Sequence, residues 1–355
     1  MSGSIASGGV SVHVADPVML ATARQARGLT QAELARQAGL SQAFISKAEA
    51  GQVELDGERL IQAADVLRYP VSLLCLTAEV HSLVSTCVFH RKRSSLPVSK
   101  IKQVHASLDL ARVQAEELLC DIPVAEVCLP RIRPSQDGEI GPRDIARRVR
   151  AGLGLAEGPV QDLTAAVEDA GVVVLSWDLG SRQGDAVSQW LAGHRPIVLM
   201  YSAAPGDRQR FSLAHELGHA VMHTEPVDRQ EEQADQFASE LLMPAKAIRG
   251  ELSNLDMPAL ARLKARWGVS MAALIRRARD LGAISDYRYK ELNIELSKAG
   301  WRSREPVEVP PERPRLLADV VALLREKGLD ERAIAERGRM DIRDLHVLLD
   351  HQGAV

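Results

Sequence analysis

The stretch Phe211–His223, "FSLAHELGHAVMH", has the periodicity of a helix that carries two histidines on one side. Residues four apart lie one turn above each other on the same face of an α-helix, so His215 and His219 can aim ring nitrogens at one point. Glu216 stands about 100° around the helix from His215, so its carboxylate approaches from another direction. Two interpretations follow: a helix that holds a metal ion, or a buried amphipathic helix whose histidines are satisfied by neighbours.

The spacing HExxH suits zinc chemistry, because neutral imidazoles bind Zn²⁺ and a carboxylate beside an open coordination position can take a proton from water. Zinc sites that hydrolyse bonds usually use a third protein ligand. A second predicted helix, "EEQADQFASELLMP" (residues 231–244), offers carboxylates at its beginning. We predict that Glu231 is this ligand, with Glu232 as the alternative. Asp235, one turn further on, is predicted to accept a hydrogen bond from the far nitrogen of a histidine ligand.

His223 is a competing candidate for the third ligand, because it lies one turn beyond His219. An unbroken helix advances about 12 Å over eight residues, however, so one ion cannot be shared by His215 and His223. No glycine follows His219 to interrupt the helix. We therefore expect His223 to mark the helix end or to support a ligand.

The residues before this helix predict a mixed helical and strand region. Pro142 and Pro159 occupy positions typical of the first turn of a helix. Three later segments have strand character, and the last two are predicted to join as a hairpin at Gly193 and His194. These segments are 172–179, 185–193 and 195–203. We expect a small antiparallel sheet, whose strand "DAVSQWLAG" (residues 185–193) could pair with an extended substrate at the sheet edge.

The N-terminal part contains a different motif, "TQAELARQAGLSQAFISKAEAG" (residues 30–51). Thr30 followed by Glu33 is the pattern of a capping box, and Ser41 is a good N-cap for a second helix. Gly39 lies between the two predicted helices, where the chain turns. The outward side of the second helix is predicted to carry Gln42, Ala43, Ser46 and Lys47. This is the geometry of a helix-turn-helix domain in an all-α region.

This motif resembles the Xre-type family of bacterial and phage DNA-binding regulators over about residues 18–74. The resemblance implies that the second helix enters the major groove of double-stranded DNA. By position in the motif, Gln42, Ala43 and Lys47 would face base edges, and Gln31 and Ser41 would lie nearer to phosphates. Glutamine can pair with adenine and lysine can reach guanine acceptors, which agrees with that placement. A helical protein-interaction module with the same core is the alternative. A homodimer is expected, because such readers commonly use two half-sites.

The segments "RFSLAHELGHAVMH" and "EEQADQFASELLMP" together resemble the ImmA/IrrE family of metallopeptidases, over about residues 142–306. The resemblance implies a zincin-like fold with Zn²⁺ on His215, His219 and Glu231, and with Glu216 as general base and acid. It also implies a protein substrate, because characterised members cut a transcriptional repressor, often one of the Xre type. The group that would stabilise the oxyanion is not identified; the candidates are Tyr201, His194 and His223.

The sequence predicts an α+β, mainly helical chain in five segments. They are a disordered leader (1–16), a helix-turn-helix domain (17–77), a connector (78–140), a metallopeptidase-like domain (141–306) and a helical extension (307–355). The connector includes a basic cluster at residues 90–93, which is either a solvated linker or a phosphate contact. It also includes a long amphipathic helix at 98–120, whose apolar stripe has 3, 4 spacing and could pack within the chain or pair two subunits. The extension could be a helical cap or could bind a partner.

The composition limits where such a protein acts. Its 44 lysines and arginines against 47 aspartates and glutamates give a net charge of −3, so DNA binding must use a local surface. No apolar run approaches the 18 or so residues that a membrane span needs, and the N-terminus does not resemble a secretory signal. The four cysteines show no CxxC pairing. We therefore expect a cytoplasmic bacterial protein with reduced thiols and no membrane partner.

Three functions are compatible with these motifs. The first is a DNA-binding regulator with an active zinc endopeptidase domain that cuts a regulatory protein such as a repressor. The second is a transcription factor or antitoxin-like repressor whose peptidase-like domain binds metal, ligand or partner without proteolysis. The third is a general peptidase held near DNA, which is disfavoured because unselective digestion is hazardous in the cytoplasm.

Overall fold

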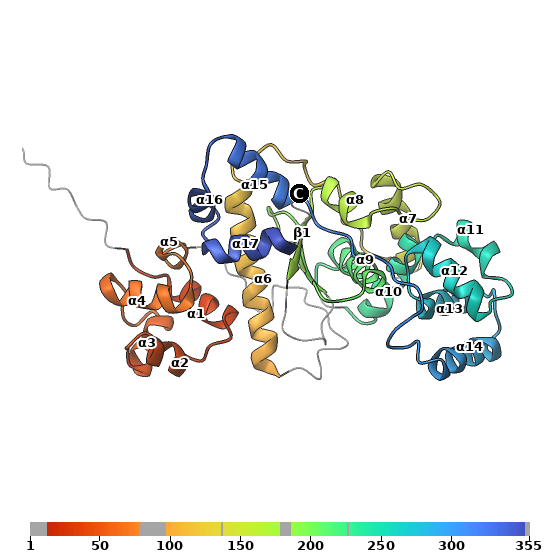
Figure 1. The fold of residues 1–355 in the computed structure, drawn as a ribbon, viewed down its shortest axis with the longest axis horizontal. Helices are drawn as coiled ribbons and strands as arrows, with labels where there is room; N and C mark the ends of the chain where they lie inside the picture. Colours follow the sequence, from red (N-terminus) through yellow and green to blue (C-terminus); the bar gives the residue numbers. More distant parts are fainter. Residues whose placement is uncertain (1–12, 78–96, 136–137, 178–185, 226, 352–355) are drawn as a thin grey trace, which may run out of the picture. The chain divides into compact units, whose positions relative to one another are not determined.

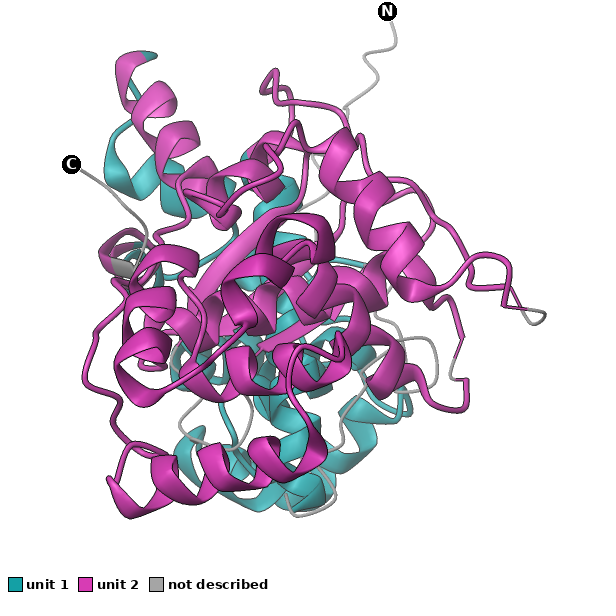
Figure 2. Ribbon diagram, turned by 90° about the vertical axis from the view of Figure 1, so that its right-hand side faces the viewer, with its two compact units in different colours: residues 1–81, 97–118, 327–345 teal, residues 82–96, 119–326, 346–355 magenta. Residues whose placement is uncertain are grey.

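The computed structural model describes residues 13–77, 97–135, 138–177, 186–225 and 227–351 (Figure 1). The chain divides into two compact units (Figure 2). Unit 1 comprises residues 1–81, 97–118 and 327–345, and unit 2 comprises residues 82–96, 119–326 and 346–355. Most of the predicted leader and the basic cluster at residues 90–93 lie outside the described residues. None of the helices in the described ranges is long and apolar enough to cross a membrane.

Unit 1 begins with five short helices, and the predicted helix-turn-helix is among them. The helices are α1 (Pro17–Ala26), α2 (Gln31–Gln37), α3 (Gln42–Glu49), α4 (Gly57–Leu67) and α5 (Val71–Leu74). Thr30 and Glu33 form the predicted capping box at α2, and the Ser41 side chain caps α3 by accepting from the Phe44 N–H. Gly39 has φ +68°, the left-handed conformation that the turn between α2 and α3 requires. The motif is therefore confirmed in its local detail.

Two later segments of the chain also belong to unit 1. The long helix α6 (Val98–Leu119) contributes Leu110 and Val113 to the same apolar core as the N-terminal helices. Its stripe is buried from Val104 onward, which agrees with the packing interpretation of that stripe. The helix α16 (Glu331–Arg337) and the beginning of α17 (Ile342–His351) lie in this unit too, where Asp344 pairs with Arg27 at 2.5 Å. The five predicted segments stay a prediction, and unit 1 contains parts of four of them: the leader, the helix-turn-helix domain, the connector and the extension.

Unit 2 contains a three-stranded sheet and the remaining helices. Before the sheet come α7 (Pro142–Gly152) and α8 (Leu163–Asp169). The strands are β1 (Val173–Trp177), β2 (Ala186–Gln189) and β3 (Ile197–Tyr201). After the sheet come α9 (Gly206–Met222), α10 (Gln230–Leu242), α11 (Ala245–Ile248), the 3₁₀ helix η2 (Arg249–Leu252), α12 (Met257–Trp267), α13 (Met271–Asp280), α14 (Asp286–Lys298) and α15 (Leu316–Glu326).

Two details of this region differ from the prediction. The sheet has the order β1-β3-β2 and is mixed, because β2 pairs antiparallel with β3 whereas β1 pairs parallel with the other side of β3. The apolar pattern gives the strands but not their direction, so a purely antiparallel sheet was the wrong expectation. Pro142 begins α7 as predicted, but the next helix begins at Leu163 rather than near Pro159. Its start is set by the Asp162 side chain, which accepts a hydrogen bond from the Ala165 N–H.

The chain that follows α14 is fastened to unit 2 by two reciprocal caps. The Glu312 carboxylate accepts from the N–H groups of Leu163 and Thr164 at 3.0 and 2.9 Å, at the start of α8. Glu168, at the other end of α8, accepts from the N–H groups of Arg315 and Leu316 at the start of α15. Because each carboxylate satisfies N–H groups that a helix leaves unpaired, α8 and α15 stabilise each other's ends.

The helices α9 and α10 approach each other closely at one glycine. A Cβ atom on Gly218 would lie 2.9 Å from Cδ1 of the fully buried Phe237, so only a residue without a side chain fits. Gly218 belongs to the HELGH segment of α9, and Phe237 belongs to α10. The metal-binding interpretation needs both helices, so this contact sets the distance between their side chains.

We predict that Gly218→Ala lowers the free energy of unfolding by about 1–3 kcal/mol, because the added methyl group overpacks the contact with Phe237. Chemical denaturation measures this change. Gly152→Ala is the matched control, because a Cβ at this helical glycine meets nothing within 4 Å. Equal stability of the two variants would contradict the close approach of α9 and α10.

Candidate metal centre and nucleic-acid interface

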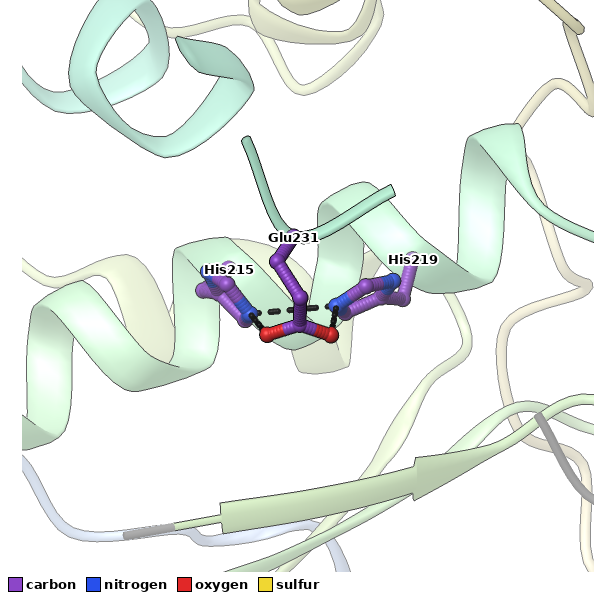
Figure 3. A group of neighbouring side chains, drawn as sticks. All are labelled: His215, His219 and Glu231. Carbon is purple, nitrogen blue, oxygen red and sulfur yellow. Dashed lines mark hydrogen bonds and ion pairs between the residues drawn. The ribbon is translucent and has the colours of Figure 1, made fainter. Parts of the chain in front are cut away.

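Three side chains from two helices converge on one point in unit 2 (Figure 3). His215 and His219 project from successive turns of α9, and Glu231 projects from the first turn of α10. The two Nε2 atoms are 3.0 Å apart. Glu231 places Oε2 at 3.7 Å from the His215 Nε2 and Oε1 at 3.5 Å from the His219 Nε2. One ligand atom from each residue therefore lies within 4.8 Å of the others.

These donors fit a zinc ion. Two imidazole nitrogens and one carboxylate are a common ligand set of catalytic zinc, and they leave a coordination position for water. Glu231 Oε1 is buried and accepts no hydrogen bond from any described residue, which is costly unless a cation balances it. The alternative ligand Glu232 instead pairs with Arg229 at 2.9 Å. The structure thus groups Glu231 with the histidines and leaves Glu232 outside the cluster.

Asp235 stands behind His215, as the sequence predicts. Its Oδ1 lies 3.0 Å from the His215 Nδ1, on the side of the ring opposite the cluster. A carboxylate there accepts the Nδ1 proton, so the lone pair on Nε2 faces Glu231 and His219. Asp235 is therefore placed where a carboxylate would orient His215 as a metal ligand.

His223 lies at the end of α9 and contacts the second histidine. It is the C-cap residue, and its backbone N–H donates to the His219 carbonyl at 2.9 Å. Its Nδ1 lies 3.0 Å from the His219 Nδ1, and its Nε2 lies 2.8 Å from Oε1 of Gln233. Burial lowers the pKa of His223, so the ring is neutral at pH 7. The sequence predicts His223 at the helix end but does not predict its contact with Gln233. That contact joins α9 to α10 and exists only in the folded structure.

Glu216 is buried beside the cluster. Its side chain accepts a hydrogen bond from the Ser188 hydroxyl of β2, with Oγ and Oε2 2.6 Å apart. This contact fixes the rotation of the carboxylate at the position where a general base is expected. Ser188 was not found from the sequence, because nothing in a strand pattern identifies the residue that faces a particular helix. A small cavity of about 40 Å³ adjoins Ser188, His219 and His223, which is room for water.

The charges of the site favour a cation. Burial lowers the pKa of His215, but the hydrogen bond to Asp235, the ion pair with Glu231 and the charge of Glu216 raise it to about 10. Without a metal ion the cluster therefore holds a proton on His215, which the three carboxylates stabilise. A zinc ion at the same point would replace that proton.

The expected route for an extended substrate differs from the structure. β2 lies at the edge of the sheet, but each of its residues is at most 6% exposed, so this edge is not open to a second chain. A larger cavity of about 820 Å³ adjoins the site on the side of Asp235. Phe211 and Ser212 of α9 and Arg276 of α13 also line it. Its size is in the range of pockets that enclose a ligand or several peptide residues.

The other two oxyanion candidates belong to the sheet region. Tyr201 ends β3 and His194 lies in the turn that precedes it. Both side chains are partly exposed, and neither lines either of the two cavities described above. His223, in contrast, contacts the side chain of His219 and lines the smaller cavity.

The predicted DNA-contacting residues gather around the start of α3 in unit 1. Ser41, Gln42, Ala43 and Lys47 are exposed, whereas Gln31 and Ser46 are partly buried. The Gln31 amide donates to Glu49 at 2.8 Å, and the Gln42 amide donates to the Gln31 oxygen at 3.4 Å. These contacts orient both glutamines before any DNA is bound. The Ser41 oxygen caps α3, which leaves its hydroxyl proton to donate to a phosphate.

Fold and site together define a helix-turn-helix protein that carries a metallopeptidase-type domain. Residues 20–74 match the helix-turn-helix family model, and residues 167–279 match the IrrE N-terminal-like domain of the peptidase family M78. No curated protein matches the chain. The chain therefore joins an Xre-type DNA-binding domain to an ImmA/IrrE-type domain, and the match to the latter includes the HELGH helix and Glu231.

The raised pKa of His215 makes a prediction about the metal-free protein. The pKa of His215 in the folded protein is about 10, above the usual 6.5. Protonated His215 therefore stabilises the folded state fully below pH 6.5, and this stabilisation is lost as the pH rises through about 10. The melting temperature of the chelator-treated protein should fall between pH 7 and 10 by more than that of His215→Gln. Parallel curves for the two proteins would show that His215 holds no such proton.

Proposed function

We propose that this protein is a DNA-binding transcriptional regulator whose second domain is a zinc-dependent, site-specific endopeptidase. The convergence of His215, His219 and Glu231 beside a buried Glu216 is the observation that carries the proposal. The substrate is a regulatory protein such as a repressor, and the second partner is double-stranded DNA, bound as a homodimer. The site of action is the bacterial cytoplasm, where both partners occur.

The side chains of the site have separate roles in this mechanism. His215, His219 and Glu231 hold the zinc ion, and Asp235 orients His215 from behind. Bound zinc supplies Lewis-acid chemistry, because it lowers the pKa of water to about 7 and polarises a carbonyl oxygen. Glu216 accepts a proton from the water that attacks the peptide carbonyl, and then delivers it to the leaving amine. Ser188 keeps the Glu216 carboxylate in position for both transfers.

The surroundings of the site support selectivity for one substrate. β2 is covered, so a random extended chain has no open sheet edge to join. The cavity beside Asp235 is lined by basic, acidic and apolar side chains, which include Arg276, Glu308 and Phe211. A substrate segment must therefore match both charge and shape before its peptide bond approaches Glu216.

The covered β2 strand also favours a second candidate function. If the sheet edge stays closed, the domain could bind zinc and a partner without hydrolysis, as a transcription factor or antitoxin-like repressor would. In that case the cavity beside Asp235 would receive a ligand or a partner side chain rather than a substrate. The two functions share every ligand of the metal and differ only in the use of Glu216.

Glu216→Gln separates the two functions. We expect peptide hydrolysis to fall by about 10²–10⁴-fold, because the amide cannot accept the proton, while zinc content and DNA binding stay unchanged. Proteins encoded beside this gene are the first substrates to test, by gel analysis and mass spectrometry of the fragments. The control is Glu232→Gln, whose carboxylate lies outside the cluster. Unaltered gene regulation in cells that carry Glu216→Gln would contradict the protease function.

The DNA-binding surface has its own test. Gln42→Ala is expected to weaken operator binding by about 1–3 kcal/mol and to relax the preference for one base. Lys47→Ala should also weaken DNA binding. If Lys47 contacts a base, the substitution changes the sequence preference; if it contacts a phosphate, the substitution lowers the slope of affinity against salt concentration by about 1. Fluorescence anisotropy at several salt concentrations measures both. Gln37→Ala, exposed on α2, is the control, and equal binding by all variants would refute this surface.

A further inference from the structure

Three histidines of α9 form a continuous series between two side chains of α10. In order, the series is Asp235, His215, His219, His223 and Gln233. Its successive polar contacts measure 3.0, 3.0, 3.0 and 2.8 Å. The histidines stand one turn apart, so neighbouring rings meet, while both ends of the series lie within one turn of α10.

We propose that Gln233 and His223 are positioning residues that fix the tautomer of the metal ligand His219. The inference rests on the proposed zinc site, and it assigns a function to two residues that contact no metal. Asp235 fixes the tautomer of His215 by a direct hydrogen bond. The Nδ1 of His219 instead meets the ring of His223, so the orientation of His219 is set through His223.

The acceptor at the end of the series determines where each proton lies. The amide oxygen Oε1 of Gln233 can only accept, so the Nε2 of His223 carries a proton. A neutral imidazole carries one proton, so the Nδ1 of His223 is an acceptor. The proton in the next contact therefore lies on the Nδ1 of His219. This leaves the lone pair of the His219 Nε2 directed at His215 and Glu231, where zinc would bind.

The opposite direction of these hydrogen bonds is incompatible with metal binding. If Gln233 presented its amide NH₂ group to His223, the Nε2 of His223 would accept and its Nδ1 would donate. The Nδ1 of His219 would then accept, and the only proton of that neutral ring would lie on Nε2, inside the metal site. A protonated nitrogen has no lone pair for zinc, so the orientation of one amide decides whether His219 can be a ligand.

Burial makes this series effective. His219 is 1% exposed and His223 is 5% exposed, so water cannot replace a missing partner at little cost. The series also makes the two histidine ligands unequal. His215 faces a charged carboxylate, whereas His219 faces a neutral ring that ends on a neutral amide. Removal of Gln233 should therefore affect one ligand and leave the other in place.

The test compares three substitutions in α10. Gln233→Leu removes the acceptor at the end of the series. Gln233→Glu supplies a carboxylate, which accepts but cannot donate when it is ionised. Gln236→Leu is the control, because it removes an amide that donates to Glu232 outside the series. Zinc affinity is measured by competition with a chelator. The proton positions of the histidines are measured by nuclear magnetic resonance of protein with ¹⁵N-labelled histidine.

We expect Gln233→Leu to weaken zinc binding by about 10-fold or more, in the range found for residues that orient metal ligands. Gln233→Glu should recover most of that loss, and Gln236→Leu should bind zinc like the unsubstituted protein. In the unsubstituted zinc-loaded protein, His223 should carry its proton on Nε2, the nitrogen that faces Gln233. This last measurement needs no substitution, so it remains decisive even if Gln233→Leu does not fold.

Three results would overturn the inference: unchanged affinity in Gln233→Leu, no recovery in Gln233→Glu, or a proton on the Nδ1 of His223 in the zinc-loaded protein. Each is distinct from failure of the proposed function. If the unsubstituted protein binds no zinc at all, the metal site itself is wrong. If it binds zinc regardless of residue 233, only the role of His223 and Gln233 is lost.

Discussion

The contact between Gly218 and Phe237 is the constraint on which the candidate site depends. It allows α9 and α10 to lie close enough for Glu231 to face two histidines of the opposite helix. The same approach places Gln233 and Asp235 behind those histidines. A glycine in a buried helix lowers intrinsic helix stability, and here it permits a dense polar cluster between two helices.

The parts of the site that the sequence predicts are those fixed within one helix. The spacing of His215, Glu216 and His219 determines their directions, because a helix has a fixed number of residues per turn. Glu231 and Asp235 were also predicted, because one turn separates them and their chemistry complements the histidines. Ser188 and Gln233 were not predicted. Their roles depend on how a strand and a second helix pack against α9, which no periodicity within a single segment contains.

The same distinction applies to the fold. The helix-turn-helix was predictable in detail, since its caps at Thr30 and Ser41 use side chains only three residues from their partners. The direction of β1 was not, because parallel and antiparallel pairing of a buried strand leave the same apolar pattern. The burial of β2 likewise depends on residues distant in the sequence. Local chemistry thus fixes where elements begin, and tertiary packing decides which edges and faces remain accessible.

The two units alternate along the sequence, because residues 97–118 and 327–345 belong to unit 1 with the helix-turn-helix, whereas residues 119–326 belong to the peptidase-type unit. Arg27 of α1 and Asp344 of α17 connect the two ends of unit 1 through an ion pair. Deleting the last thirty residues would therefore remove part of the unit that contains the helix-turn-helix, although this segment is the furthest from α3 along the chain. Loss of DNA binding in such a truncated protein would be a defect of the fold of unit 1 and would carry no information about a separate C-terminal module.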